Sequence, residues 1–245
     1  MKKIGIIFII AYVSLLFSLF FVGCNKNDDT SEQKNNFTDS RDGKVYSTVT
    51  IGEQVWMAEN LSYLPSVSDP VVNSYTIPYY YVWGYFNENV DSARVTNNFK
   101  TYGTLYNWAA AMAGSESDSS NPSSVQGVCP DGWHLPSDAE WTQLTDYLGG
   151  DSLAGGKLKE TGTIHWNSPN TSATNETGFS ALPGGNTGVS EGFYRLKNNG
   201  EWWSATETET DVEGARNRYM SHDRSDVSKG SGDKRLGYSV RCVKD

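Results

Sequence analysis

The sequence has few of the residues from which common catalytic and metal sites are built. It contains three cysteines and three histidines in 245 residues, and no His or Cys stands at zinc-ligand spacing from Cys129 or Cys242. Walker and dinucleotide-binding motifs are absent, and Ser204 in WWSATE lacks the GxSxG context of a nucleophile elbow. These absences argue against a zinc protein, a nucleotide-binding protein and a triad built on Ser204.

Positive charge is also scarce. The chain has 20 Lys and Arg against 29 Asp and Glu, a net charge of −9. Phosphate backbones are bound by clusters of Lys and Arg that release counterions. We therefore expect no nucleic acid among the partners.

Hydrophobic residues make up 37% of the chain, a low share for a globular protein. The 8 Trp, 14 Tyr and 9 Phe compensate, because each aromatic side chain can bury a large area. The length fits one domain, or two at most, and we expect aromatic residues to form much of its core.

The N-terminus has the pattern of a targeting signal. Lys2 and Lys3 precede an uncharged apolar run, Ile4 to Val22, which ends at Gly23-Cys24. The run is long enough to span a bilayer as a retained helix. The junction Phe21-Val22-Gly23-Cys24 instead resembles a bacterial lipoprotein signal, although Leu is commonest where Phe21 stands. It implies that residues 1–23 are cleaved and that Cys24 is lipidated, which leaves 18 positive and 29 negative residues, a net charge of −11.

Residues 24–40 are polar, with one aromatic residue and no apolar periodicity. Such a segment buries too little surface to order itself, so we interpret it as a flexible tether. Asp28-Asp29 resembles the acidic export signal of surface lipoproteins in Bacteroidetes, and ordinary linker polarity explains the pair equally well. The domain itself is expected over residues 41–245.

Several patterns predict regular structure in this domain. Alternating apolar residues on both sides of Gly52 predict a hairpin with one apolar face, formed by Val45, Val49, Ile51, Val55 and Met57. A short helix is predicted by apolar residues at helical spacing before Gly114, namely Leu105, Trp108, Ala109 and Met112. A second helix is predicted by a capping box of Ser137 and Glu140 and by the terminating Gly149, with Trp141, Leu144 and Leu148 toward the core.

From Gly155 to Asp245 the chain is rich in Gly, Thr, Ser and Asn, with short apolar islands. This composition indicates short strands joined by long loops, with no further helix of any length. The fold class is therefore α+β. So long a stretch with so little regular structure usually carries functional loops.

Six motifs carry a resemblance to a known family. They are DGKVYSTVTIGEQVWMAENL, YGTLYNWAAAM, GVCPDGWHLPSDAEWTQL, GFSALPGG, WWSATE and GYSVRCVKD. In this order they closely resemble the Fibrobacter succinogenes major paralogous domain, a module of secreted proteins and lipoproteins in Fibrobacter and Bacteroidetes. Pro65 to Lys100 holds no family motif and is interpreted as an insertion. The family has no settled activity to carry over.

A more distant likeness concerns the fold. GWHLPSDAEW and GYSVRC are similar to the helix and terminal strand of sulfatase-modifying domains, which are C-type-lectin-like. The resemblance implies two main helices, a twisted antiparallel sheet and long irregular loops. Cys129 and Cys242 form an even pair in an oxidising compartment, bonded or as buried free thiols. Their placement is that of the long-range disulfide of C-type lectins, whereas the sulfatase-modifying enzymes' cysteine signature is absent.

The histidines have no motif that makes any of them a base. His134 lies between Trp133 and Leu135 in the lead-in of the predicted helix, and we expect it to be packed and hydrogen-bonded. His165 and His222 have no catalytic context either.

Two groups of side chains are candidates for ligand contact. The first group is four acidic residues at alternate positions, Glu207, Glu209, Asp211 and Glu213. In a strand they would share one face able to hold calcium. Otherwise they belong to a charged, solvated loop. Four aromatic residues are candidates for stacking on sugar rings, unless they belong to the core: Trp166, Tyr194, Trp202 and Trp203. Since Trp202 and Trp203 are adjacent, we expect one of them to point outward and to meet the ligand.

We therefore expect a non-enzymatic domain, anchored to the membrane through lipid, that binds a glycan or a protein through its loops between Pro183 and Arg235. The expected location is the bacterial outer membrane, on the cell surface or facing the periplasm. Two alternatives are a hydrolase of surface polysaccharide that uses two carboxylates, and a structural part of a surface assembly.

Overall fold

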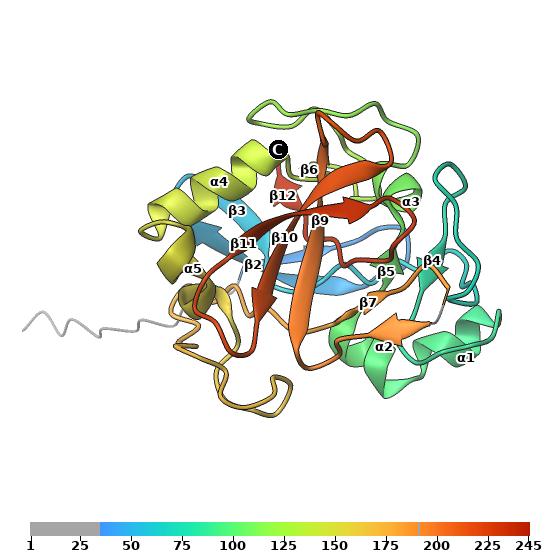
Figure 1. Cartoon of the computed structure of the whole chain (residues 1–245), viewed down its shortest axis with the longest axis horizontal. Coiled ribbons are helices and arrows are strands. Elements are labelled where there is room, and N and C mark those ends of the chain that lie inside the picture. Colours follow the sequence, from blue (N-terminus) through green and yellow to red (C-terminus); the bar gives the residue numbers. More distant parts are fainter. Residues whose placement is uncertain (1–34, 191) are drawn as a thin grey trace, which may run out of the picture. The chain divides into compact units, whose positions relative to one another are not determined.

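The computed structural model describes residues 35–190 and 192–245 (Figure 1). The helices are α1 (Val90–Arg94), α2 (Asn97–Tyr102), α3 (Trp108–Met112), α4 (Asp138–Tyr147) and α5 (Asp151–Leu158). The strands before α4 are β1 (Asn35–Thr38), β2 (Val45–Ile51), β3 (Gln54–Met57), β4 (Tyr80–Tyr81), β5 (Leu105–Tyr106) and β6 (Trp133–His134). The strands after α5 are β7 (Asn186–Thr187), β8 (Phe193–Tyr194), β9 (Asn199–Glu207), β10 (Gly214–Ser221), β11 (Ser228–Asp233) and β12 (Val243–Lys244).

Two antiparallel sheets form the centre of the fold. One has the order β1-β2-β3-β12-β6, and the other has the order β11-β10-β9. The pairs β4-β5 and β7-β8 form two small additional sheets. The helices α4 and α5 lie at the left of Figure 1, and α1 and α2 lie at the lower right. The expectation of a mixed α and β fold with antiparallel sheets is confirmed.

The compact unit begins earlier than residue 41. Residues 35–38, expected to be part of a flexible tether, form β1 and pair with the first half of β2. The reason is Phe37, the one aromatic residue of that segment, whose ring lies 5.2 Å from the ring of Trp133. The apolar run Ile4 to Val22 lies outside the described residues. Within the described part of the chain, no helix is long and apolar enough to cross a membrane.

The predicted hairpin is present, but its apolar residues do not share one face. The turn at Gly52-Glu53 pairs Ile51 with Gln54 and Val49 with Trp56. Because a two-residue turn joins positions i and i+3, odd positions of β2 lie beside even positions of β3. Trp56 and Met57 are both fully buried, so the hairpin is covered on its two sides.

The capping box is confirmed at the start of α4. The Ser137 hydroxyl accepts a hydrogen bond from the Glu140 backbone N–H, and the Glu140 carboxylate accepts one from the Ser137 N–H. The Trp141 and Leu144 side chains of this helix face the core and are fully buried. The helix predicted before Gly114 is α3, which starts at Trp108 because Leu105 belongs to β5.

Helices α1, α2 and α5 were not predicted. Residues 151–158 contain Gly155-Gly156, which weakens helix propensity and hides α5 in the sequence. A Cβ at Gly156 would lie 2.6 Å from the Ser172 carbonyl oxygen, and one at Gly155 would overlap the Asp226 carbonyl. The glycines are therefore required by two loops that lie directly against the helix.

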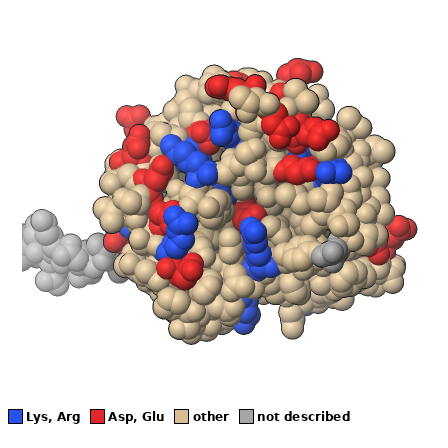
Figure 2. Space-filling view, in the orientation of Figure 1, with Lys and Arg blue, Asp and Glu red and all other residues tan. Residues whose placement is uncertain are grey.

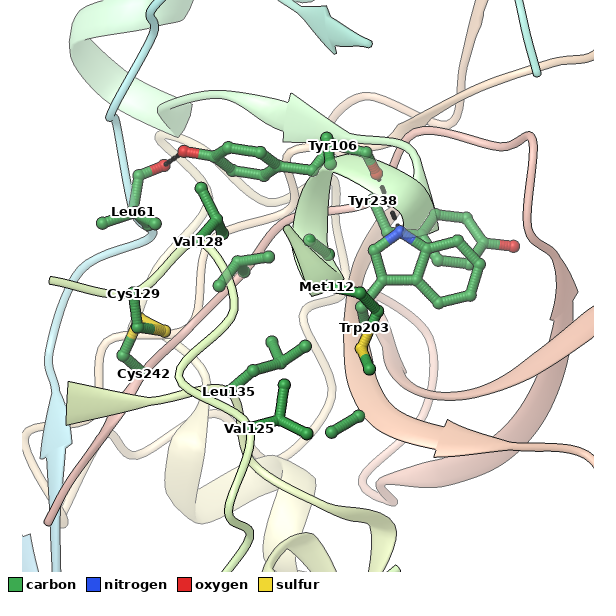
Figure 3. Packing of buried hydrophobic residues seen from close by; sticks show 14 of the residues in the cluster. Leu61, Tyr106, Met112, Val125, Val128, Cys129, Leu135, Trp203, Tyr238 and Cys242 are labelled. Atoms are coloured by element: carbon green, nitrogen blue, oxygen red, sulfur yellow. Dashed lines mark hydrogen bonds between the residues drawn. A yellow bond between two sulfur atoms is a disulfide. The ribbon is translucent and has the colours of Figure 1, made fainter. Parts of the chain in front are cut away.

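Two large hydrophobic clusters fill the interior. One lies around α3 and the Cys129–Cys242 disulfide and includes Trp203 and Tyr238 (Figure 3). The other lies beneath α4 and includes Trp56, Trp141 and Trp202. Because β9 contributes one tryptophan to each cluster, this strand is covered on both faces.

Residues 65–100 form a subregion with its own small core. Its helices and β4 surround a third buried cluster, which contains Leu64, Val67, Val82 and Ala93 with Phe99 packed against it. The Asn89 side chain caps α1, and the Thr96 side chain caps α2. The segment is therefore ordered by local packing.

The expected pairing of Cys129 with Cys242 is present. Their Cα atoms lie 6.0 Å apart, and the bond joins residues separated by 113 positions. It ties the segment before β6 to the end of the chain inside the first cluster (Figure 3). The alternative of free thiols is wrong for this structure.

Removing the disulfide will lower stability. A Cys129→Ala/Cys242→Ala variant is expected to lose about 4 to 5 kcal/mol of unfolding free energy, since a bond closing so long a loop restricts the unfolded chain. Urea unfolding monitored by tryptophan fluorescence measures this. The reduced wild type serves as the control and should lose a comparable amount. If oxidised and reduced protein unfold at the same urea concentration, the prediction is wrong.

Candidate functional site

The expectation that Trp202 or Trp203 points outward is wrong. Both side chains have 0% of their surface exposed. The Trp202 indole N–H donates to the Asn60 side-chain oxygen at 2.9 Å, and the Trp203 indole N–H donates to the Tyr106 carbonyl at 2.7 Å. Alternation exposes one residue of a pair only when one sheet face is solvated, and β9 has core on both faces. Neither ring can meet a ligand.

Trp166 is also part of the core, with 0% exposure. Its indole N–H donates to the Ala181 carbonyl at 3.0 Å, and the Lys159 ammonium lies 5.3 Å from its ring centroid. Burial lowers the pKa of Lys159 to about 8, against the opposing charges of Asp223 and Asp226. Its ammonium donates to three backbone carbonyls, those of Thr171, Ser221 and Arg224.

Tyr194, the fourth aromatic candidate, lies at the surface with 37% exposure. It belongs to a group of aromatic residues that we call the aromatic ledge: Trp83, Phe86, Phe193 and Tyr194. The Phe193 ring lies 5.7 Å from the Trp83 ring and 5.5 Å from the Phe86 ring, and the Trp83 indole N–H donates to the Tyr194 carbonyl at 3.4 Å. Phe86 is 62% exposed. The ledge joins residues 65–100 to β8.

The charged side chains of the described residues are unevenly distributed over the face shown in Figure 2. In Figure 2 they alternate in sign over β10 and β11, whereas few are seen at the lower right, over β4, β7, β8 and α2. Polar groups remain close by, since the Asn98 side chain donates to the Trp83 carbonyl at 3.0 Å. The stretch IPYYYVWGYF, residues 77–86, supplies Trp83 and Phe86 of the ledge and is rich in aromatic residues. Its lack of any strand or helix period was the available signal that some rings are exposed.

The carboxylates expected in one strand are not brought together. Strand β9 ends at Glu207, whose carboxylate accepts from the Lys234 ammonium at 2.5 Å. Asp211 and Glu213 lie in or beside the following turn, where Asp211 accepts from the Glu213 N–H and Glu213 accepts from the Tyr75 hydroxyl. Glu209 lies in the same turn. Among the described residues, no group of three or more His, Cys, Asp or Glu could hold a metal ion.

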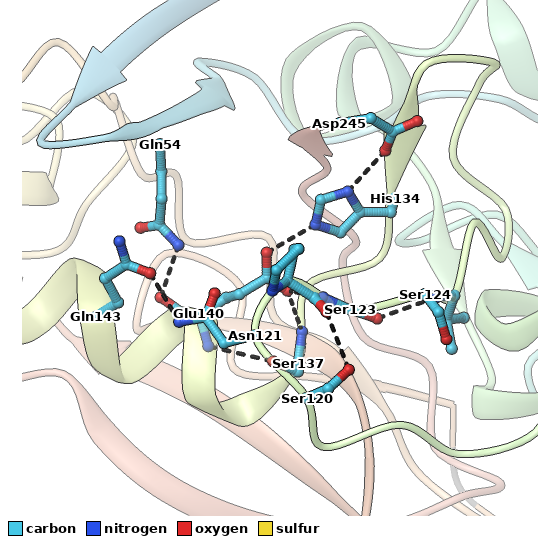
Figure 4. Close-up of polar contacts among 12 residues, drawn as sticks. Gln54, Ser120, Asn121, Ser123, Ser124, His134, Ser137, Glu140, Gln143 and Asp245 are labelled. Carbon is cyan, nitrogen blue, oxygen red and sulfur yellow. Dashed lines mark hydrogen bonds and ion pairs between the residues drawn. The ribbon is translucent and has the colours of Figure 1, made fainter.

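His134 is packed and hydrogen-bonded, as expected. Its Nε2 lies 2.7 Å from a Glu140 oxygen, and its Nδ1 lies 2.8 Å from an Asp245 oxygen (Figure 4). The other Glu140 oxygen accepts from the N–H groups of Ser123 and Ser137. Burial lowers the pKa of His134, but the hydrogen bonds and negative charges of its two carboxylate partners outweigh it, so the pKa is raised. The imidazole thus links β6, α4 and the C-terminal residue Asp245.

The other histidines have separate partners. The His165 Nδ1 lies 2.8 Å from a Glu160 oxygen, and the His222 Nδ1 lies 3.0 Å from the Ser168 carbonyl oxygen. Cys24, the expected lipidation site, lies outside the described residues.

Comparison with known proteins identifies the family. The family model of the Fibrobacter succinogenes major domain matches residues 49–244. The chain therefore belongs to this family, which confirms the resemblance seen in its motifs. No curated protein and no solved structure matches the sequence significantly.

The imidazole link predicts a pH-dependent stability difference. Since the pKa of His134 is raised on folding, its contribution is full below the unfolded pKa of about 6.5 and is lost as pH rises through the folded value. His134→Gln should lower the unfolding free energy by about 2 kcal/mol at acidic pH, as expected for charge-assisted hydrogen bonds, and by less at alkaline pH.

Urea unfolding of the variant and wild type at about pH 5.5 and 9 checks the preceding prediction. His222→Gln is the matched control, because the partner of that imidazole is a backbone carbonyl. A destabilisation by His134→Gln that is equal at the two pH values contradicts it.

Proposed function

We propose that this chain is a membrane-anchored lipoprotein whose compact domain binds a glycan at the aromatic ledge without catalysing a reaction. The observation that carries the proposal is an aromatic group at the surface: the half-buried Phe193 ring packs against Trp83 and against the exposed Phe86, and the exposed Tyr194 follows in the same strand. Exposed aromatic groups of this kind mark binding sites, because solvated apolar area is costly.

The chemistry of the ledge favours a sugar. Aromatic side chains offer an apolar face for the C–H side of a sugar ring, and a few polar groups then fix its orientation. Asn98 supplies an amide beside Trp83. Phe193 contacts two other rings of the ledge, which holds the surface in shape before a ligand arrives. Such preorganisation reduces the entropy lost on binding.

A polysaccharide hydrolase is the second candidate from the sequence, and one feature favours it. Glu59 and Glu160 line the same cleft. Both carboxylates already have partners, however: Glu59 accepts from the Ser47 N–H and pairs with Lys44, and Glu160 pairs with His165. A glycosidase requires one carboxyl group that donates a proton and one that acts as a base or nucleophile. Binding therefore agrees better with these contacts.

The finer description of the fold is part of the proposal. A C-type-lectin-like architecture is supported by the disulfide between the segment before β6 and the end of the chain, by the short helices and by the long loops. The outer-membrane location, on the cell surface or facing the periplasm, is supported by the sequence around Cys24. A purely structural part in a surface assembly would use the same exposed apolar residues without a sugar.

Removing a ring from the ledge will weaken glycan binding. A glycan array probed with the full chain first identifies a ligand, and calorimetry then measures its affinity. Phe86→Ala is expected to weaken binding about tenfold, the loss typical of an aromatic contact at a binding site. Since the side chain is 62% exposed, the unfolding free energy should change by less than about 0.5 kcal/mol.

Tyr147→Ala is the control for the ledge variant. This ring is 66% exposed but belongs to the last turn of α4. It should leave glycan affinity unchanged. If Phe86→Ala binds the array ligand as tightly as wild type, or if Tyr147→Ala weakens binding equally, the ledge is not the site.

The lipid anchor gives a separate prediction. Protein extracted from bacterial membranes should lack residues 1–23 and carry acyl chains on Cys24, because the N-terminal sequence resembles a lipoprotein signal. Intact mass spectrometry measures both. A Cys24→Ser variant, which lacks the thiol, should retain residues 1–23 and carry no acyl chain. A wild-type chain with Met1 or an unmodified Cys24 contradicts the prediction.

A further inference from the structure

A second site lies beside the helix that borders the aromatic ledge. It is a cleft of about 410 Å³ whose lining includes Lys44, Glu59, Phe99, Lys100, Glu160 and Ser180. These residues come from the ends of the β2–β3 hairpin, from α2, and from the loops after α5. The cleft is of a size that fits a small ligand or one unit of a polymer.

Each carboxylate of this cleft already has a partner within the chain. Glu59 lies 3.2 Å from the Lys44 ammonium and also accepts the Ser47 N–H. Glu160 lies 2.8 Å from His165. A ligand therefore meets two carboxylates that have hydrogen-bonded partners.

Two cations at the same place lack an acidic partner. Lys100 makes no ion pair within the described part of the chain, and its exposed side chain lines the cleft. Arg241 lies behind the cleft: its guanidinium is fully buried and donates to Asn60 and Ser180, both of which line the cleft. Its Nε has no hydrogen-bond partner. No carboxylate in the described residues lies within ion-pair distance of it.

The positive charge of Arg241 persists at neutral pH. Burial lowers the pKa of the guanidinium to about 9, with the charge of Glu59 opposing the shift. An uncompensated charge in a poorly solvated place acts on the cleft more strongly than one in water. The cleft therefore has a buried positive charge behind its floor and a movable ammonium at its rim.

We infer that this cleft binds the carboxylate of an acidic sugar, with Lys100 as its direct ionic contact and Arg241 as the buried charge that favours it. The hydroxyls of the same sugar face the Ser180 and Thr101 side of the lining, and Phe99 supplies an apolar wall. The inference rests on the proposed function in taking the ligand to be a glycan.

The cleft and the ledge share a border. In α2, Asn98 contacts Trp83 of the ledge, and the next residues, Phe99 and Lys100, line the cleft. A six-residue helix is about 9 Å long, so both sites lie within reach of one short oligosaccharide. We expect an acidic polysaccharide to occupy both, with one unit on the rings and a charged unit in the cleft.

The test compares two probes that differ at the carboxyl groups, which are charged in one and methylated in the other. Calorimetry with the purified full chain measures the affinity of tetragalacturonate and of its methyl ester. Wild type should prefer the acid, and the preference should fall with added salt. Lys100→Gln should weaken binding of the acid about fourfold, the range of one exposed ion pair, and leave the ester unchanged. Lys229→Gln removes an exposed lysine of β11 as the control and should change neither affinity.

The outcomes separate this inference from the ledge. If Lys100→Gln weakens neither probe or both equally, or if Lys229→Gln matches it, the acidic-sugar inference is overturned. Should Phe86→Ala still weaken both probes in that case, the ledge stands. If Lys100→Gln removes the preference for the acid while Phe86→Ala has no effect, the cleft stands and the ledge fails. Absence of binding of both probes by wild type overturns the inference, whereas the array ligand still tests the ledge.

Discussion

The structure depends on the last segment of the chain, residues 237–245, which runs through its middle. Its backbone exchanges hydrogen bonds with Tyr106, Leu61, Met57 and Trp203. Cys242 in this segment is bonded to Cys129, and Val243 pairs with both β3 and β6. The first cluster and the second both include residues of this segment. Since these contacts join positions far apart in sequence, neither core is complete until the end of the chain is in place.

Buried cations order the loops that have no regular secondary structure. Lys159 and Arg241 are fully buried, and most of their hydrogen bonds go to loop carbonyls: Lys159 donates to Thr171, Ser221 and Arg224, and Arg241 donates to Phe179 and Ser180. A buried charge is tolerated only when hydrogen bonds replace water, and buried carbonyls need donors just as strictly. The same contacts thus give each buried cation acceptors and give the carbonyls a donor, and they tie these segments to the end of α5 and to residues 237–245.

Predictions from local sequence patterns were accurate where interactions between neighbouring residues determine the structure. The capping box of Ser137 and Glu140 predicted α4, and alternating apolar residues around Gly52 predicted the hairpin there, although not its burial on two sides. The even pair of cysteines in the domain, placed like the long-range disulfide of C-type lectins, correctly indicated the partner of Cys129. The errors concern contacts made by distant segments. Both tryptophans of WWSATE are buried because two cores meet at β9. Helix α5 carries glycines because Ser172 and Asp226 lie against it. No period in the sequence reports which segments will cover a strand or a helix.

The core and the proposed site take their aromatic residues from different parts of the chain. Aromatic residues inside the family motifs, such as Trp141 and Trp203, fill the two large clusters, whereas the rings of the ledge come from residues 65–100 and from β8. Residues 65–100 also expose apolar side chains over more than half of their surface, at Val71, Ile77, Phe86 and Val95. Because this segment has its own small core, its outer side chains can change without disturbing the two clusters that hold the fold. A surface with that freedom, next to the cleft lined by Lys100, suits the ligand contact that we propose, because binding residues concentrate on segments that a rigid scaffold holds.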